Sequence, residues 1–210
     1  MTLTELKTLI QSYLENEETT FVSTLNDFIV NAEDRIFELI QFDYFRKNVT
    51  GNLTTGNTYL TAPSDFLTSF SLAIIDSNND YHYLDKKHTS FMREYSNDAV
   101  ATSERGKPLY YADFDKELST ASNNGSTLIV SPVPDQDYNV ELHYLYKPVS
   151  LTSTTSGTWI SQNARNALLY GSLVEAYTFM KGDADLMQLY EQRFNLEVLR
   201  LKNQAEARGR

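Results

Sequence analysis

The sequence contains no cysteine, which excludes a disulfide framework, a thiolate nucleophile and a cysteine-ligated zinc site. It has only eight glycines and five prolines in 210 residues, and the glycines form neither a phosphate-binding loop nor a nucleophile elbow. No run approaches the roughly 18 apolar residues of a membrane-spanning helix, and the first residues lack the basic start and apolar core of a signal peptide. We therefore expect no membrane span, and a fold stabilised by packing.

Basic residues are also scarce. The chain has 18 Lys and Arg against 28 Asp and Glu, a formal net charge of -10 at pH 7. Tight binding of nucleic acid needs clustered basic residues, so this composition argues against it. The charge is uneven, with -7 in residues 1–43 and +2 from Glu191 onward. Two interpretations stay open: a solvated helix face at each end, or an acidic element of one subunit that meets a basic tail of another.

Histidines and the acidic turn "DSNND" at 76–80 are the candidate metal ligands. His82, His88 and His143 are too far apart in sequence for a recognisable metal pattern. The turn has acidic residues at alternate positions, as calcium loops do, but Tyr81 replaces the required glycine and Lys87 the required glutamate. The sequence therefore predicts a hairpin turn and no metal site.

Candidate catalytic groups are equally weak. Glu141 and His143 share one face of a predicted strand, which would allow a proton relay but is also typical of a solvated sheet face. Asp135 and Asp137 suit the closing of a turn through nearby backbone amides. We expect no catalytic residue and no cofactor.

Aromatic residues are enriched, with 14 Tyr and 11 Phe. Strands and cores account for about half of them. Tyr110 and Tyr111 are adjacent and so lie on opposite strand faces, and both cannot be buried in a thin sheet. This surplus predicts surfaces that contact other proteins.

Both ends of the chain have helical periodicity. Thr2 can cap a short helix through Leu14, and Thr19 or Thr20 can cap a longer one that runs to Ile40. Two further helices are predicted near residues 168–180 and 186–201, with a break at "KGD", residues 181–183. The pattern of the last helix is formed by Leu186, Tyr190, Phe194, Val198 and Leu201.

The middle has a period of two. Phe70, Leu72 and Ile74 alternate on one face, and the chain returns through Tyr81–Leu84 as a hairpin. Three more strands are predicted in "PLYYADFD", "STLIVSP" and "YNVELHYLYKP", with a weak helical patch at 91–95 and loops around 96–107 and 149–161. The predicted fold class is α+β: a helical bundle from residues 1–43 and 160–210, with a β-rich antiparallel insertion at 44–159.

A series of motifs along most of the chain resembles the adaptor, or head-to-tail connector, proteins of short-tailed bacteriophages. The series comprises an aromatic patch after the long N-terminal helix, "YLTAPSDFL" at 59–67, "GKPLYYADFD" at 106–115, "LIVSPVPDQDYNVELHYLYKPVSLT" at 128–152, and the helical end "ALLYGSLVEAYTFM". The P-x-P-D-x-x-Y strand followed by K-P-x-x-L is its most specific part.

The resemblance implies a structural virion protein without enzymatic activity, assembled in the host cytoplasm. It implies a ring of twelve copies beneath the portal protein, with the β-rich insertion directed toward the tail nozzle protein and DNA passing through the channel without specific binding. The residues expected to bind the portal are Arg193, Arg200, Lys202, Arg208 and Arg210. Those expected to bind the nozzle are Ser77, Asn78, Asn79, Asp80, Glu104, Arg105 and Lys107, within the hairpin tip and the loop 96–107.

Three other functions stay open on the sequence alone. The chain could be another tail or nozzle component, which differs from an adaptor in stoichiometry on the portal. A tail-associated cell-wall hydrolase would depend on groups such as Glu141 and Asp135. A carbohydrate-binding module with exposed aromatic side chains predicts stable free monomers that bind glycans.

Overall fold

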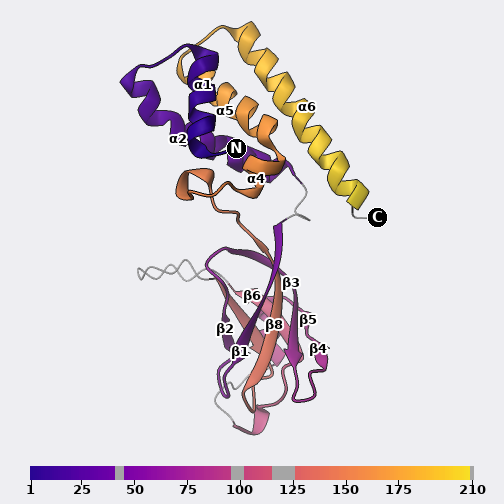
Figure 1. Ribbon diagram of the computed structural model, residues 1–210. Coiled ribbons are helices and arrows are strands. Elements are labelled where there is room, and N and C mark those ends of the chain that lie inside the picture. The colour runs from indigo at the N-terminus through magenta and orange to yellow at the C-terminus, as the bar shows by residue number, and fades with distance from the viewer. Residues whose placement is uncertain (41–44, 96–101, 115–125, 209–210) are drawn as a thin grey trace. The chain divides into compact units, whose positions relative to one another are not determined.

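The computed structural model describes residues 1–40, 45–95, 102–114 and 126–208, with side chains as far as residue 204. In these residues the chain forms six α-helices and two four-stranded sheets (Figure 1), which confirms the predicted α+β class with terminal helices and a central β region. The chain divides into two compact units. The helical unit is Met1–Tyr44 with Pro148–Arg210, and the β unit is Phe45–Lys147.

The helical unit contains α1 (Leu3–Leu14), α2 (Thr19–Leu39), α4 (Trp159–Asn163), α5 (Arg165–Phe179) and α6 (Ala184–Arg208), with a 3-10 turn, η3 (Leu151–Ser153). Thr2 caps α1 as predicted: its hydroxyl accepts the Glu5 amide at 3.2 Å, and the Glu5 carboxylate accepts the Thr2 amide at 2.9 Å. The predicted threonine cap of α2 is wrong. Glu18 is the N-cap residue, because Asn16 accepts the Glu18 amide and the helix begins one residue earlier.

Helix α5 packs between α2 and α6, and Gly171 permits the close approach. A Cβ atom at Gly171 would lie 3.0 Å from the Phe194 ring and 3.1 Å from the Ala32 Cβ, closer than ordinary contacts. The break between α5 and α6 falls at Lys181, which has a φ of 53°, so the "KGD" prediction is confirmed. The loop predicted at residues 149–161 ends earlier than expected. Thr158 and Ser161 form a capping box that starts the short α4.

The β unit is a sandwich of two sheets, with core residues from both. Sheet A has the order β1-β8-β3-β4, formed by β1 (Arg46–Leu53), β8 (Tyr138–Tyr146), β3 (Phe66–Ile75) and β4 (Tyr81–Tyr83). Sheet B has the order β2-β7-β6-β5, formed by β2 (Tyr59–Thr61), β7 (Thr127–Ser131), β6 (Tyr110–Phe114) and β5 (Asp85–Lys86). Helix α3 (Thr89–Tyr95) and the 3-10 turn η2 (Thr102–Glu104) complete the unit. The predicted hairpin of β3 and β4 is confirmed.

Strand β1 was not predicted. Its sequence contains Asn48, Gly51 and Asn52, which favour turns. Nevertheless all eight residues pair with β8, from Arg46 opposite Leu145 to Leu53 opposite Tyr138. The partner strand therefore overrides the local preference, as is common for strands.

The predicted face of β3 is correct except at Phe70. Leu72 and Ile74 are buried, but Phe70 is 44% exposed. The register with β8 shifts between Ser69 and Ser71, so Phe70 is an extra residue in a β-bulge and the alternation is reset there. The Arg46 guanidinium lies 4.2 Å from the centre of the Phe70 ring and covers part of it.

Asp113 joins the two sheets of the sandwich. Its carboxylate, on β6 of sheet B, accepts the hydroxyls of Thr68 and Ser69 from β3 of sheet A, and Lys86 Nζ donates to it at 2.7 Å. Tyr111 is buried in the core, whereas Tyr110 contacts the rings of Phe91 and Tyr95 with centroids 5.1 Å away. Both tyrosines are thus used within the chain, and neither supports the predicted partner surface.

Candidate assembly surfaces

Helix α6 is apolar on two opposite faces. Its inner face buries Phe194, Val198 and Leu201 in the bundle. Its outer face carries Leu189, Leu196 and Leu199, which are 41%, 59% and 53% exposed. Steps of seven and three residues place these leucines on one side of a helix, so they form a continuous row that we call the leucine stripe. Exposed apolar rows of this kind are typical of protein contacts.

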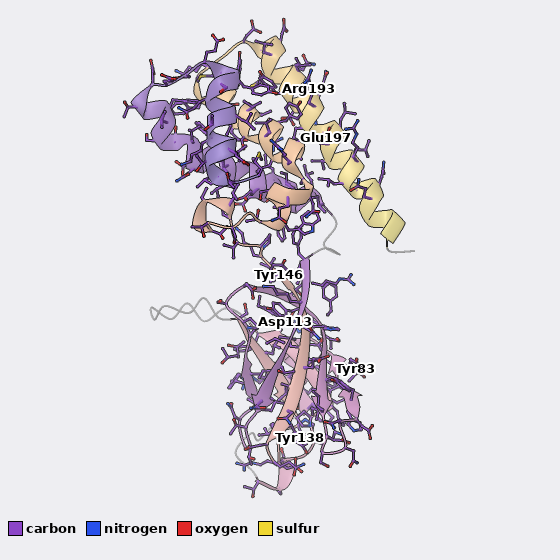
Figure 2. The ribbon with its side chains drawn as sticks, in the orientation of Figure 1. Tyr83, Asp113, Tyr138, Tyr146, Arg193 and Glu197 are labelled. Atoms are coloured by element: carbon purple, nitrogen blue, oxygen red, sulfur yellow. The ribbon has the colours of Figure 1, made fainter. Side chains whose placement is uncertain are left out.

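Three of the residues expected to bind the portal have described side chains on α6. Arg193 is exposed and donates to the Tyr170 hydroxyl at 3.1 Å, a bond that raises the pKa of this guanidinium. Arg200 donates to Glu197 at 2.7 Å and its side chain is 71% exposed (Figure 2 labels Arg193 and Glu197). Lys202 is partly buried. The Arg208 side chain and Arg210 lie outside the described residues.

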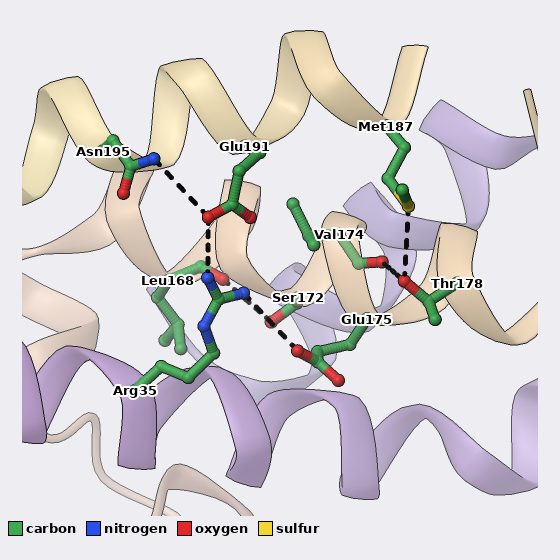
Figure 3. Close-up of polar contacts among 9 residues, drawn as sticks. All are labelled: Arg35, Leu168, Ser172, Val174, Glu175, Thr178, Met187, Glu191 and Asn195. Carbon is green, nitrogen blue, oxygen red and sulfur yellow. Dashed lines mark hydrogen bonds and ion pairs between the residues drawn. The ribbon is translucent and has the colours of Figure 1, made fainter. Parts of the chain in front are cut away.

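A polar cluster holds α6 against its neighbours. Arg35 on α2 donates to Glu191 on α6 at 2.8 Å and lies 3.5 Å from Glu175 on α5 (Figure 3). The same guanidinium lies 4.6 Å from the centre of the Phe194 ring. These groups are about one third exposed, so each ion pair contributes at most about 1 kcal/mol. The orientation of α6, with the leucine stripe outward, follows mainly from the burial of Phe194, Val198 and Leu201.

The stripe was visible in the sequence but was not recognised. The predicted face of this helix comprised Leu186, Tyr190, Phe194, Val198 and Leu201. The remaining leucines at 189, 196 and 199 also follow helical spacing. A second apolar row on one helix is the signal that could have found it.

The hairpin tip expected to bind the nozzle is a turn organised by Asp76. Its carboxylate accepts the backbone amides of Asn78 and Asp80 at 2.8 and 3.0 Å and lies 2.9 Å from His82 Nε2. The hydrogen bond with His82, and then those two amides, lower the pKa of Asp76 to about 2. Through these bonds Asp76 closes the turn of the predicted hairpin between β3 and β4. The whole tip, residues 77–80, is exposed.

The second nozzle segment contacts other loops of the β unit. The Arg105 guanidinium lies beside Gly56, and the Gly106 amide donates to Val133 O at 2.9 Å. Glu104 is exposed and Lys107 is partly buried, whereas residues 96–101 of the predicted loop lie outside the described part of the chain.

Asp137 was predicted to close a local turn. Instead its carboxylate accepts hydrogen bonds from the amide and the hydroxyl of Thr55, both at 2.8 Å. These two bonds lower the pKa of Asp137. Asp135 likewise accepts the Tyr138 hydroxyl at 2.7 Å. Asp137, Thr54 and Ser77 line an open hollow of about 680 Å³. The two predicted nozzle segments therefore contact loops that meet at one end of the sandwich.

The groups considered for catalysis do not form a centre. Glu141 and His143 lie on the outer face of β8, as predicted, and His143 is exposed. Within residues whose placement is described, no three His, Asp or Glu side chains gather where they could bind a metal ion. The same residues include no helix with the length and apolar character needed to cross a bilayer.

This arrangement indicates a class of protein. A chain with one helix that is apolar on two faces is typical of a subunit that acts through contacts with other proteins.

The model of the SU10 adaptor protein family matches residues 1–210, and the chain belongs to this family. Its role is therefore that of a structural adaptor in the head-to-tail connection of a bacteriophage, and it is a virion component. The resemblance found in the sequence is confirmed. No curated protein matches the chain.

Proposed function

We propose that twelve copies of this chain form a closed ring that joins the portal protein to the tail nozzle protein and lets DNA pass through its channel. The observation that carries the proposal is the leucine stripe, which lies opposite the face that α6 uses within its own bundle. A subunit that contacts a different patch on each neighbour forms a ring if the rotation closes. An acidic chain of net charge -10 supports passage of DNA without tight binding.

The stripe would contribute measurably to the affinity of a contact between copies. A fully buried leucine gains about 1.5–3 kcal/mol, so three leucines that are roughly half exposed would gain about 3 kcal/mol together on docking. This corresponds to an affinity increase of roughly 150-fold. Replacing Leu196 and Leu199 by Glu removes most of this gain and puts charges into the contact.

Mass measurement on the purified chain mixed with its portal tests the ring. The wild type should add a fixed number of copies, and Leu196→Glu with Leu199→Glu should reduce assembly at least 100-fold. Leu109→Glu is the matched control, since Leu109 is 51% exposed but lies in the β unit. Normal assembly of the double variant would contradict the proposed contact.

The orientation of the ring is a further part of the proposal. Arg193, Arg200, Lys202, Arg208 and Arg210 would face the portal. Ser77, Asn78, Asn79, Asp80, Glu104, Arg105 and Lys107 would face the nozzle. Deleting residues 202–210 should weaken recruitment to portal rings without affecting nozzle binding. Replacing Asn78 and Asp80 by Ala should weaken binding to the nozzle without affecting recruitment to portal rings. Unchanged recruitment after the deletion of residues 202–210 would rule out the portal assignment.

A further inference from the structure

Among the described residues, the sandwich of the β unit is covered on one side and open on the other. On the side of β4 and β5 the chain crosses from sheet A to sheet B, and Leu84, only 6% exposed, fills the space between the sheets. On the opposite side, the eight residues of β1 face only the three residues of β2. An apolar hollow of about 210 Å³ remains there, lined by Val49, Gly51, Leu60, Ala62, Val140 and Leu142 among others.

Val49 and Gly51 show that the middle of the inner face of β1 is uncovered by the described residues, whereas Leu53 on the same face is buried. They pair with Leu142 and Val140, which are both buried, so they lie on the core side of the sheet. Val49 is nevertheless 39% exposed. A Cβ atom at Gly51 would meet only the Val140 Cγ2 atom, at an ordinary 3.8 Å, and the backbone at this position is not left-handed. Nothing within the described chain requires a glycine there. Glycine within a strand is often found where another backbone approaches closely.

Strand β1 is also an edge with free pairing capacity. The Leu84 amide donates to Leu72 O at 2.9 Å, so the backbone groups of Leu72 point toward β4. The backbone N–H and C=O groups of successive residues point alternately to the two sides of a strand. Leu142 lies opposite Leu72, so its backbone groups point toward β1, where Val49 is its partner. The backbone groups of Thr50 and Asn52 therefore point away from the sheet. Natural edge strands are usually protected by proline, charge or short length. Residues 48–52 have no proline and no charge.

We propose that the occupant of this edge is β4 from a second copy of the chain, so that sheet A continues from one subunit into the next. This contact rests on the ring proposed above and names a second place where neighbours meet. Strand β4 is the opposite edge of the same sheet, and by the alternation just described Tyr81 and Tyr83 direct their backbone groups outward. Since β1 and β4 run in opposite directions, copies related by a ring rotation bring them together as antiparallel neighbours.

The side chains select one register and one partner. Tyr83 opposite Thr50 and Tyr81 opposite Asn52 place His82 opposite Gly51, where the missing side chain leaves room. The outer tyrosines, 48% and 66% exposed, would then cover the joint. A second copy therefore offers free backbone groups, a matching register and aromatic cover together.

Cysteine cross-linking of the full chain assembled on its portal tests this contact. The chain has no cysteine, so a variant with Thr50→Cys and Tyr83→Cys has only the engineered pair, at a separation that suits a disulfide. Oxidation should produce a ladder of covalent multimers from the double variant and not from either single variant. Full-sized rings without a ladder, or cross-links to the portal or nozzle protein, would overturn the proposed contact between β1 and β4. Either result would still agree with the proposed ring. Failure to form any ring would overturn both.

Filling the hollow provides an independent test. Gly51→Val should leave the thermal unfolding midpoint of the isolated chain unchanged or higher, because space is available, yet reduce cross-linking at least 10-fold. Val22→Leu, at a position 37% exposed on α2, is the control for a larger apolar side chain at an exposed site outside the β unit. Wild-type cross-linking by a folded Gly51→Val variant would overturn the proposal.

Discussion

Glu33 is a buried carboxylate whose removal can be predicted in detail. It lies on α2 and is 5% exposed. Its two oxygens accept the Leu151 backbone amide at 3.0 and 3.3 Å, so it fastens η3 to the helix. Burial raises the pKa of this carboxyl above its ordinary value of 4.5, against the opposing effect of its hydrogen bonds. The group therefore satisfies a buried donor and at the same time carries an unfavourable charge.

We consider Glu33→Ala and Glu33→Gln. Alanine leaves the Leu151 amide without its acceptor, which costs about 1–3 kcal/mol of unfolding free energy. A loss of about 2 kcal/mol in a chain of this length lowers the Tm by roughly 4–8 °C. Glutamine keeps an acceptor oxygen and removes the charge, so its stability at pH 7 should lie within about 1 kcal/mol of the wild type.

The pH dependence has a definite sign. Because the folded state binds the Glu33 proton more tightly than the unfolded state, the stability contributed by Glu33 falls as pH rises from 4.5 through the raised pKa. Glu33→Gln lacks this dependence. Urea unfolding followed by the helical circular dichroism signal between pH 4 and 8 gives both free energies. Their difference, wild type minus Gln variant, should decrease with pH, and a flat or rising difference would refute the reasoning.

Three further predictions concern other parts of the fold. Asp76→Asn should lower the unfolding midpoint at pH 5 but not near pH 2. The pKa of Asp76 is lowered to about 2 from an ordinary value of 3.8, so the ionised carboxylate stabilises the fold above pH 3.8, and this stability is lost as the pH falls through 2. Asp113→Ala should cost about 1–3 kcal/mol in urea unfolding, since the Ser69 and Lys86 donors lose their acceptor between the sheets. Phe194→Ala should cost about 3–5 kcal/mol by the same assay, because the ring is completely buried beside Gly171; a loss below 1 kcal/mol would contradict its role in the core.

Much of the fold could be predicted because its signals are local. The apolar periodicity of α2, α5 and α6 and the alternation along β8 each require only a few neighbouring residues. Strand β1 could not be predicted, because its asparagines and glycine favour turns and only pairing with β8 makes them a strand. The bulge at Phe70 could not be predicted for a similar reason, because a register shift depends on how two strands pair.

The candidate surfaces were only partly predictable. The sequence indicated the basic end of α6 and the polar hairpin tip as contact regions, and these assignments stay proposals. It did not indicate that Asp137 binds Thr55, 82 residues away, or that Arg105 lies against Gly56. Such contacts depend on which loops the strand order brings to the same end of a sandwich.

The sequence by itself determined the α+β class, most helices and strands, the acidic and cysteine-free character of the chain, and the resemblance to phage adaptors. Tertiary structure alone decided which apolar residues remain exposed. Leu196 and Phe194 are equally apolar, but only one of them faces the bundle. The Val49 side chain lies on the core side of its sheet but remains 39% exposed, because β2 is short. Periodicity identifies the faces of an element, whereas burial depends on partners far away in the chain.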